Sequence, residues 1–342
     1  MKRHGNLWDK IVAPDNLYKA YRKARKGKST QKGILEFEKD VNGNLLKLQK
    51  MLCTNKFTTS KYRSKTIHEP KKREIYILPF YPDRVVQHAL LQIVAPIWNN
   101  LMIHDSYACR EGKGMHDASR KTMRHVSNYK YCLKCDIRKF YPSIDHNILM
   151  GIVSKKIKCS RTLFLLEDII RSFEGGKNTP IGNYTSQWFG NLYMHELDIN
   201  LKQDHGVKTL IRYCDDFVMF SNSKSELNKL RVHIETFIKD KLDLTFSKWS
   251  IFKVVQGVDF LGYRHFPDKI LLRKTTAKRV AKRIKGLPKL LMKGRITFDQ
   301  YTSSIASTKG WLQWANTYNL KLNLKLEGES DERIPENYQQ QA

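Results

Sequence analysis

The chain has 342 residues, of which 41% are hydrophobic and 11% aromatic, enough for one large or two to three small units with buried cores. Its 62 Lys and Arg residues against 33 Asp and Glu residues give a net charge of +29, spread along the sequence, which predicts a polyanionic partner; a merely soluble basic surface is the alternative. Because no apolar run is long enough to cross a membrane and the N-terminus is not apolar, we expect neither membrane insertion nor secretion but a cytoplasmic location.

The expected elements of the first half are mainly helical. Residues 1–60 carry apolar positions every three or four residues, which predict an amphipathic helix packed on a core: Ile34, Phe37, Val41, Leu45, Leu48 and Leu52. After them we expect, in order, a basic turn at 70–74, a strand at 75–78, a helix at 85–98 and a phosphate-approaching loop at 106–116.

The second half alternates strands with helices. Residues 209–220 predict two short strands around Cys214, Asp215 and Asp216, that is, a hairpin with carboxylates at its turn. The other expected elements are a strand at 130–137, a helix at 144–157, a helix ending at Leu197, a helix at 227–242, a hairpin at 258–266, a basic helix at 273–294 and a helix with Trp311 and Trp314 in the core.

Six cysteines are scattered without the pattern of a secreted disulfide framework, so we expect them to be reduced. Cys132 and Cys135 form a C-x-x-C. Their segment alternates like a strand, on which they would face opposite sides, and no second Cys or His pair follows at zinc spacing. We therefore expect neither a metal nor a redox role for the pair.

Three carboxylates carry the predicted chemistry. Asp215 and Asp216 interrupt an apolar run, and Asp136 ends a second strand-like run. An aspartate pair alone would indicate a solvated turn, but buried carboxylates need a cation. Carboxylates at the ends of core strands can hold two divalent metals about 3.5–4 Å apart, the arrangement that supports nucleotidyl transfer. Mg²⁺ suits such oxygen ligands, and Mn²⁺ can substitute.

Two motifs carry a family resemblance. The run Tyr213-Cys214-Asp215-Asp216 resembles the Y-x-D-D motif of reverse transcriptases, and residues 136–141 (DIRKFY) resemble their D-x-x-x-[FY]-[FY] motif. Residues 83–87, 107–116 and 257–263 are similar to the fingers helix, the next block and the primer-grip hairpin of that family. This resemblance implies an RNA-directed DNA polymerase with an α+β fold: a right-hand polymerase with an antiparallel palm sheet, fingers and a helical thumb.

The resemblance also implies the domain order. We expect an N-terminal helical extension at 1–60, fingers at 61–130, a palm at 131–268 with a fingers-like insertion at 145–178, a thumb at 269–322 and a flexible tail at 323–342, with no room for an RNase H domain.

Roles follow by resemblance where residues match. Asp136, Asp215 and Asp216 become the catalytic metal ligands, with the Ile137 carbonyl as a further ligand. Tyr141 resembles the aromatic gate that excludes a 2′ hydroxyl, unless it is core and Phe140 is the inward ring. The remaining expected nucleotide contacts are Lys72, Arg73, Ile181, Gly182, Gln187 and Lys248.

For Lys72 and Arg73 a solvated turn remains open, and the place of Lys248 near the triphosphate also remains open. Tyr213, Cys214, Phe260, Leu261, Gly262 and Tyr263 complete the motif and primer grip. The expected backbone contacts are Arg84, Arg110 and the helix lysines Lys274, Lys278, Lys282 and Lys285, for which a solvated face is the alternative.

One segment departs from the common pattern. In residues 180–187 (PIGNYTSQ), Ile181 stands where Gln precedes the Gly, and Gln187 where Pro follows the Ser. This variant resembles the reverse transcriptases of diversity-generating retroelements, as do residues 106–110 and 307–319. That resemblance implies error-prone copying of a template-repeat RNA at adenines, with template RNA, primer or cDNA, dNTPs and a pentameric basic accessory variability protein as partners.

Ile181 offers a physical reason for infidelity, because it supplies a bulky β-branched group without a hydrogen-bond donor; filling core space is the alternative. Other enzymes of the family fit less well. A group II intron protein would carry a maturase region and Q-G-x-x-x-S-P, and a retron enzyme would carry N-A-x-x-H and V-T-G. A defence-associated polymerase stays open. An inactive nucleic-acid-binding scaffold would predict a broken triad, whereas all three aspartates are present.

Overall fold

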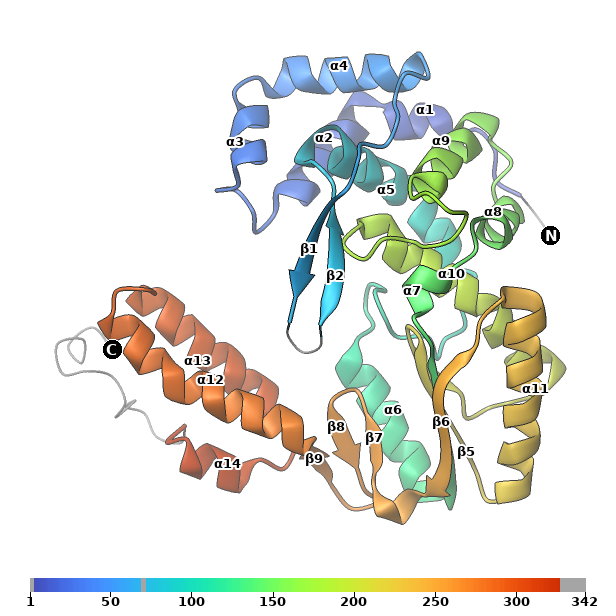
Figure 1. Ribbon diagram of the computed structural model, residues 1–342, viewed down its shortest axis with the longest axis vertical. Coiled ribbons are helices and arrows are strands. Elements are labelled where there is room, and N and C mark those ends of the chain that lie inside the picture. The colour runs from blue at the N-terminus through green and yellow to red at the C-terminus, as the bar shows by residue number, and fades with distance from the viewer. Residues whose placement is uncertain (1–2, 69–71, 327–342) are drawn as a thin grey trace. The chain divides into compact units, whose positions relative to one another are not determined.

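The computed structural model describes residues 3–68 and 72–326, which fall into two compact units (Figure 1). The first unit comprises the described parts of 1–113, 134–217 and 229–249; the second comprises 114–133, 218–228 and 250–326. The second unit therefore takes residues 114–130, which the sequence placed in the fingers, together with residues from the predicted palm and thumb. Each unit is described by itself.

The first unit begins with helices α1 (Trp8–Val12), α2 (Pro14–Arg25), α3 (Lys32–Glu38) and α4 (Val41–Cys53). The prediction of a single amphipathic helix across α3 and α4 was wrong. Asp40 interrupts it, because its side chain caps α4 by accepting a hydrogen bond from the Gly43 amide at 2.9 Å. The apolar spacing continues across the break, so periodicity alone could not reveal it.

A hairpin and a long helix follow. Strands β1 (Arg63–Ile67) and β2 (Arg73–Ile77) pair antiparallel, and a short helical turn, η1 (Phe80–Arg84), leads into α5 (Val85–Asn99). The predicted strand at 75–78 is confirmed, but it starts at Arg73, and its partner β1 was not predicted. Part of the predicted basic turn, residues 69–71, lies outside the described residues. Asn16 on α2 donates to the Ala89 carbonyl at 3.1 Å and ties α2 to α5.

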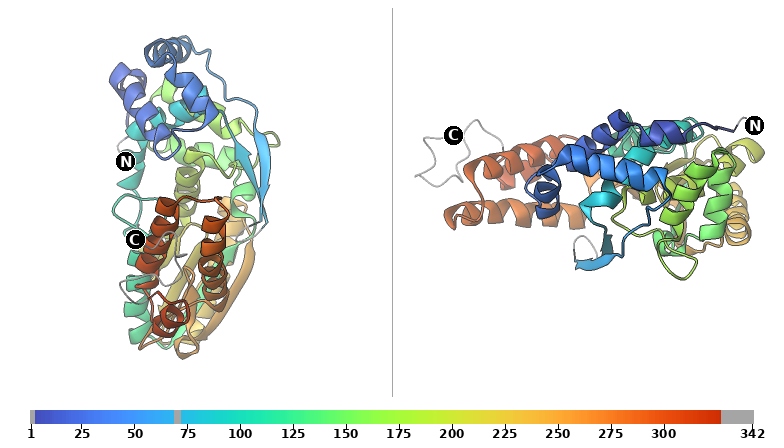
Figure 2. Two further views of the ribbon diagram at one scale, coloured as in Figure 1. Left: turned by 90° about the vertical axis from the view of Figure 1, so that its left-hand side faces the viewer. Right: turned by 90° about the horizontal axis from the view of Figure 1, so that it is seen from above.

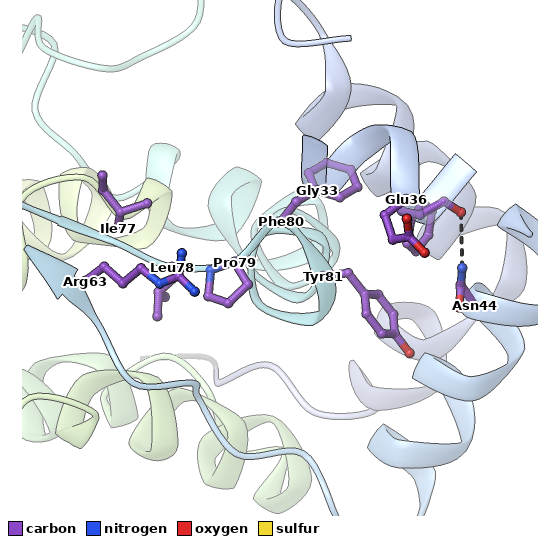
Figure 3. A pocket seen from close by; sticks show the side chains of 10 residues that line it. Gly33, Glu36, Asn44, Arg63, Ile77, Leu78, Pro79, Phe80 and Tyr81 are labelled. Atoms are coloured by element: carbon purple, nitrogen blue, oxygen red, sulfur yellow. Dashed lines mark hydrogen bonds between the residues drawn. The ribbon is translucent and has the colours of Figure 1, made fainter. Parts of the chain in front are cut away.

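A pocket of about 450 Å³ lies where α3 and α4 meet the end of β2 and η1 (Figure 3). Aromatic rings of Phe37, Phe80 and Tyr81 line it, with Arg63 and Glu36 as charged groups. None of the residues predicted to act in catalysis lines this pocket, so it lies apart from the predicted chemistry.

A four-stranded sheet has the order β4 (Ile211–Tyr213), β5 (Asp216–Ser221), β3 (Tyr131–Ile137), β6 (Phe246–Lys253). Cys132 and Cys135 on β3 are both fully buried and both free. Because positions three apart on a strand face opposite sides, both faces of β3 are covered, and the C-x-x-C is core. The helices in this part of the chain are α7 (Phe140–Ser143), α8 (His146–Ser154), α9 (Ser160–Arg171), α10 (Tyr184–Ile199), the turn η2 (Asn200–Asp204) and α11 (Lys224–Leu242).

The second unit contains helix α6 (Met115–Asn128), the turn η3 (Val254–Gln256) and a three-stranded antiparallel sheet of β7 (Val258–Phe260), β8 (Tyr263–His265) and β9 (Ile270–Leu272). The predicted hairpin at 258–266 is confirmed, and β9 adds an unpredicted strand. Helix α6 packs on β8, where Ser119 Oγ lies 2.7 Å from His265 Nε2. His265 is fully buried.

Two helices, α12 (Lys274–Met292) and α13 (Phe298–Leu312), lie side by side and are followed by α14 (Tyr318–Asn323) (Figure 2). Their core includes Leu324 and Leu326, so the predicted start of the tail at 323 was wrong; residues from 327 lie outside the described part. Trp311 packs against this core as predicted. Trp314 does not, because it follows the end of α13 and stacks on His116 with ring centroids 4.2 Å apart.

Candidate active site

The three predicted catalytic aspartates lie on neighbouring strands. Asp136 is the penultimate residue of β3, whereas Asp215 lies in the two-residue connection between β4 and β5, and Asp216 opens β5. Because β5 pairs with β3 in the sheet, the hairpin turn and the end of β3 lie near one another, and the charges of Asp136 and Asp215 act on Asp216. All three side chains are half-buried. The predicted hairpin with carboxylates at its turn is confirmed.

Burial and charge act on Asp216 together. Burial, the largest cause, and the neighbouring charges of Asp136 and Asp215 together raise the pKa of this carboxyl to about 6, against the opposing effect of Lys134. The Lys134 Nζ lies 3.5 Å from Asp216 Oδ2. Asp216 Oδ1 is buried without a hydrogen-bond partner. A buried carboxylate oxygen without a partner is costly, and a cation would supply the missing interaction.

The chemistry of this donor set fits a divalent cation such as Mg²⁺, because hard cations prefer carboxylate oxygens. The geometry does not form a closed cluster: within residues 3–68 and 72–326, no three His, Cys, Asp or Glu side chains are grouped so that they could hold a metal ion. The Ile137 carbonyl stays a predicted ligand.

The turn that carries Asp215 has an unusual backbone. Cys214 has φ +57°, a left-handed conformation that non-glycine residues rarely adopt. Cys109, which faces Cys214, has the same left-handed conformation, with φ +55°. A hydrogen bond between the two thiols lowers the pKa of Cys109 and raises that of Cys214. The Tyr141 hydroxyl lies 3.9 Å from Cys214 Sγ, so the predicted gate residue and the motif cysteine are neighbours.

The structure decides which of two adjacent aromatic residues is core. Phe140 is only 3% exposed, whereas Tyr141 is half-buried, and burial raises the pKa of its hydroxyl. Gly190 on α10 makes room for both, because a Cβ there would lie 3.0 Å from the Phe140 ring and 3.1 Å from the Tyr141 ring. Phe140 is therefore the core ring of the pair, and Tyr141 keeps the gate role as a prediction.

The segment around Ile181 is joined to the β1–β2 hairpin. The Tyr76 amide donates to the Ile181 carbonyl at 2.8 Å. Gly182 has φ +123°, and a Cβ there would lie only 2.3 Å from the Tyr76 carbonyl oxygen. This close approach requires glycine. The Ile181 side chain is half-buried, and Gln187 is exposed.

The remaining predicted nucleotide contacts are exposed. Lys72 directly precedes β2, Arg73 begins it, and Lys248 lies on β6; all three side chains are exposed. In the second unit, Phe260 and Tyr263 are fully buried and flank the Leu261-Gly262 turn. The α12 lysines are exposed: Lys274, Lys278, Lys282 and Lys285. Their predicted roles stay predictions.

The structure gives two predicted phosphate contacts different surroundings. Arg84 is half-buried, and burial lowers the pKa of its guanidinium. Arg110 makes four hydrogen bonds within the protein, to the side chain and carbonyl of Asn99 and to the carbonyls of Ile103 and Ser106. The predicted phosphate role of Arg110 is thus corrected to an internal one, because four of its five N–H groups are already engaged.

A cavity of about 320 Å³ adjoins the catalytic turn through Cys109. Its wall includes a stacked pair, His88 and Tyr184, with ring centroids 4.4 Å apart, and Lys23 also lines it. The sequence did not reveal this wall, since the two rings come from α5 and α10, elements far apart along the chain.

The sequence also did not reveal the buried ion pair of Arg212 and Asp198, for which the available signal was a single arginine in the apolar run of β4.

The sequence of this chain is similar to sequences of known proteins. A family model described as "Reverse transcriptase (RNA-dependent DNA polymerase)" matches residues 64–265. The group II intron-encoded protein LtrA of Lactococcus lactis subsp. cremoris is 24% identical over 81% of this chain and 58% of its own length. Protein YkfC of Escherichia coli is 23% identical over 55% of this chain and 61% of its own length.

The chain thus spans about three fifths of the length of these curated relatives. Among solved structures, apo telomerase from Candida tropicalis, truncated from its C-terminal domain, aligns with a TM-score of 0.46 and 14% identity over 68% of this chain and 60% of that one. The predicted α+β class is confirmed, because the described residues combine helices with antiparallel sheets. With its Y-x-D-D turn inside a family match that covers more than half of its residues, the chain belongs to the reverse transcriptase family.

Proposed function

We propose that this protein is an RNA-directed DNA polymerase that extends a primer on template RNA with dNTPs. The observation that carries the proposal is the gathering of Asp136, Asp215 and Asp216 at the ends of adjacent strands, where two of them raise the pKa of the third. The net charge of +29 supports a nucleic-acid partner. No described helix is long and apolar enough to cross a membrane.

Reverse transcriptases use divalent metal ions such as Mg²⁺. When bound, Mg²⁺ or Mn²⁺ would lower the pKa of the primer 3′ hydroxyl and neutralise charge on the leaving pyrophosphate. The three aspartates would hold the metal, with the unpartnered Oδ1 of Asp216 available as a ligand atom. Tyr141, whose neighbour Phe140 is fixed in the core, would place its ring against the sugar of the incoming nucleotide and exclude a 2′ hydroxyl.

Primer extension on an RNA template tests this proposal. The native chain should extend the primer only when Mg²⁺ or Mn²⁺ is present, and the double variant Asp215→Ala with Asp216→Ala should be inactive. Asp240→Ala is the matched control, since Asp240 is an exposed carboxylate on α11 and its loss should leave extension unchanged. Failure of the native chain to extend any primer would instead favour an inactive nucleic-acid-binding scaffold.

The finer proposal is that the enzyme diversifies a target gene. Residues 180–187 support it, because Ile181 and Gln187 resemble diversity-generating retroelement enzymes rather than the common pattern. In this reading the enzyme copies a template-repeat RNA with errors at adenines and acts with a pentameric basic accessory variability protein. Sequencing the extension products, with and without that protein, should show errors concentrated at template adenines. Ile181→Gln should reduce them.

A second candidate is a group II intron-like reverse transcriptase without a diversification role. Its support is the 24% identity to LtrA over 81% of the chain. Accurate extension at all four template bases, with no change when Ile181 is replaced by Gln, would favour this candidate over the first.

A further inference from the structure

A buried arginine lies directly behind the catalytic turn. Arg212 on β4 is 0% exposed, and its partner Asp198 on α10 is 1% exposed. The Arg212 Nε lies 2.8 Å and 3.0 Å from the two carboxylate oxygens of Asp198, and its Nη2 lies 2.5 Å from Oδ2. Two charges removed from water this completely need near-ideal geometry, and this fork-on-carboxylate pairing provides it.

The same guanidinium reaches the turn itself. Its Nη1 donates to the Cys214 carbonyl at 3.1 Å and to Asn191 Oδ1 at 3.1 Å, and its Nη2 reaches the Asn191 carbonyl at 3.4 Å. All five N–H groups of Arg212 are therefore engaged. Asn191 in turn donates to the Ala108 carbonyl at 2.8 Å, which connects the network to the segment that carries Cys109.

The contacted carbonyl belongs to the peptide that joins Cys214 to Asp215. Because Cys214 is held in the left-handed region, this peptide would relax to another orientation if nothing fixed it. Backbone bonds also fix Arg212, since its amide donates to the Asp105 carbonyl at 2.9 Å and its carbonyl accepts from the Tyr107 amide at 3.0 Å. A rigidly placed donor thus holds the strained peptide immediately before the first motif carboxylate.

We infer that Arg212, locked by Asp198 and Asn191, is a positioning residue: it orients the Cys214–Asp215 peptide so that the carboxylates of Asp215 and Asp216 face Asp136 for metal binding. The inference rests on the proposed polymerase function and adds a residue to its machinery that touches neither metal nor substrate. Its charge is paired with Asp198 inside the protein, and its planar guanidinium also reaches Asn191 and the Cys214 carbonyl. Lysine could keep the charge but not the geometry.

The test removes the pair without leaving a buried charge. Loss of Arg212 alone would strand the Asp198 carboxylate and risk unfolding, so the informative variant is Arg212→Met with Asp198→Leu, a neutral replacement of similar volume. We expect this double variant to fold, with a melting temperature within about 5 °C of the native chain. Arg212→Lys keeps a charge opposite Asp198 and serves as the conservative variant.

Mn²⁺ binding followed by electron paramagnetic resonance reads the site without any turnover. We expect the double variant to bind Mn²⁺ at least about five-fold more weakly, and its kcat for primer extension to fall at least about ten-fold, because misoriented ligands lose both affinity and alignment. The KM for dNTP should change less than kcat. Arg212→Lys should fall between the native chain and the double variant on both measurements.

Tyr193→Phe is the matched control. It removes a buried hydrogen bond on the same helix, from the Tyr193 hydroxyl to the Leu242 carbonyl at 2.7 Å, away from the turn. It should lower the melting temperature and leave Mn²⁺ affinity unchanged. Native-like Mn²⁺ affinity and kcat in a folded double variant would overturn the inference while the polymerase remains. An inactive native chain would count against the proposed function instead, with the Mn²⁺ measurement still deciding the role of Arg212.

Discussion

Two tight turns in this protein contain residues in the left-handed backbone region, and different interactions stabilise the two turns. The catalytic turn between β4 and β5 and the turn between β7 and β8 each have two residues. Leu261 and Gly262 both have positive φ, +58° and +83°, the pattern of a type I′ hairpin turn, which matches strand twist by itself. In the catalytic turn only the first residue, Cys214, has positive φ, at +57°.

Glycine is the usual residue at that first position, and here cysteine occupies it. The turn between β7 and β8 is therefore set by local chemistry, with open space around Gly262. The catalytic turn is set by tertiary structure, through the buried hydrogen bond from Arg212 to the Cys214 carbonyl. Strain at a functional turn persists when its surroundings determine it.

The largest effect is expected at the catalytic turn. Asp216→Asn should lower kcat for extension by about a thousand-fold or more, because it removes a charged metal ligand. The same change should stabilise the fold by about 1–2 kcal/mol at pH 7, since burial and two carboxylates raise the pKa of Asp216 to about 6. Extension kinetics and thermal unfolding measure the two effects. A variant that is both active and less stable would contradict this account.

The second-largest effect is expected at His265, near the turn between β7 and β8. Burial lowers the pKa of His265 to about 4, so the folded protein keeps this imidazole neutral while the unfolded chain protonates it below about pH 6.5. Since the unfolded state then binds more protons, stability should be lost as the pH falls from about 6.5 to 4, by up to about 3 kcal/mol from this group. Urea unfolding across that range should show a weaker pH dependence in His265→Gln, whereas an equal dependence in both proteins would refute the assignment.

A smaller effect is expected at Gly262. No atom lies within 4 Å of a Cβ added there, so Gly262→Ala meets only the cost of a left-handed backbone. We expect a loss of about 1 kcal/mol in the free energy of unfolding, measured by urea titration. Gly286→Ala on α12, which also meets no atom within 4 Å and lies inside a helix, should instead be neutral or stabilising by up to about 1 kcal/mol.

The smallest effect distinguishes the two turns most directly. Cys214→Gly relieves the left-handed residue, so stability should be unchanged or rise by less than about 1 kcal/mol. If Arg212 holds the peptide as inferred, kcat should fall only a few-fold, because the hydrogen bond to the carbonyl at position 214 is retained. A loss of activity as large as that of Asp216→Asn would show that the cysteine side chain itself is needed.

The sequence predicted the elements whose signals are local. The β4–β5 hairpin could be recognised because apolar strands flank a turn that carries carboxylates, and the hairpin at 258–266 because a glycine separates two short runs of alternating apolar and polar residues. Strand β1 was missed because R-S-K-T-I is almost entirely exposed and has no apolar alternation. The break between α3 and α4 was missed because one capping aspartate ends a helix without disturbing the apolar spacing.

The candidate site was predictable in its residues but not in its supports. The aspartates could be identified from motif and context, whereas Arg212 and Asp198 lie on different elements and show their pairing only in three dimensions. The assignment of Arg110 to phosphate contact was wrong for a related reason. A basic residue in a glycine-containing loop has the same sequence whether its guanidinium faces solvent or binds carbonyls of its own chain.

The contact between Gly182 and Tyr76 restricts substitution at position 182 but not at position 181. Any side chain at position 182 would collide with the main-chain oxygen of Tyr76, so only glycine fits there. At position 181 the backbone is held by the hydrogen bond that the Tyr76 amide donates to the Ile181 carbonyl. The side chain there is only half-buried, so other side chains can replace it. The residue at 181 can therefore be exchanged without shifting the backbone around it, whereas the residue at 182 cannot.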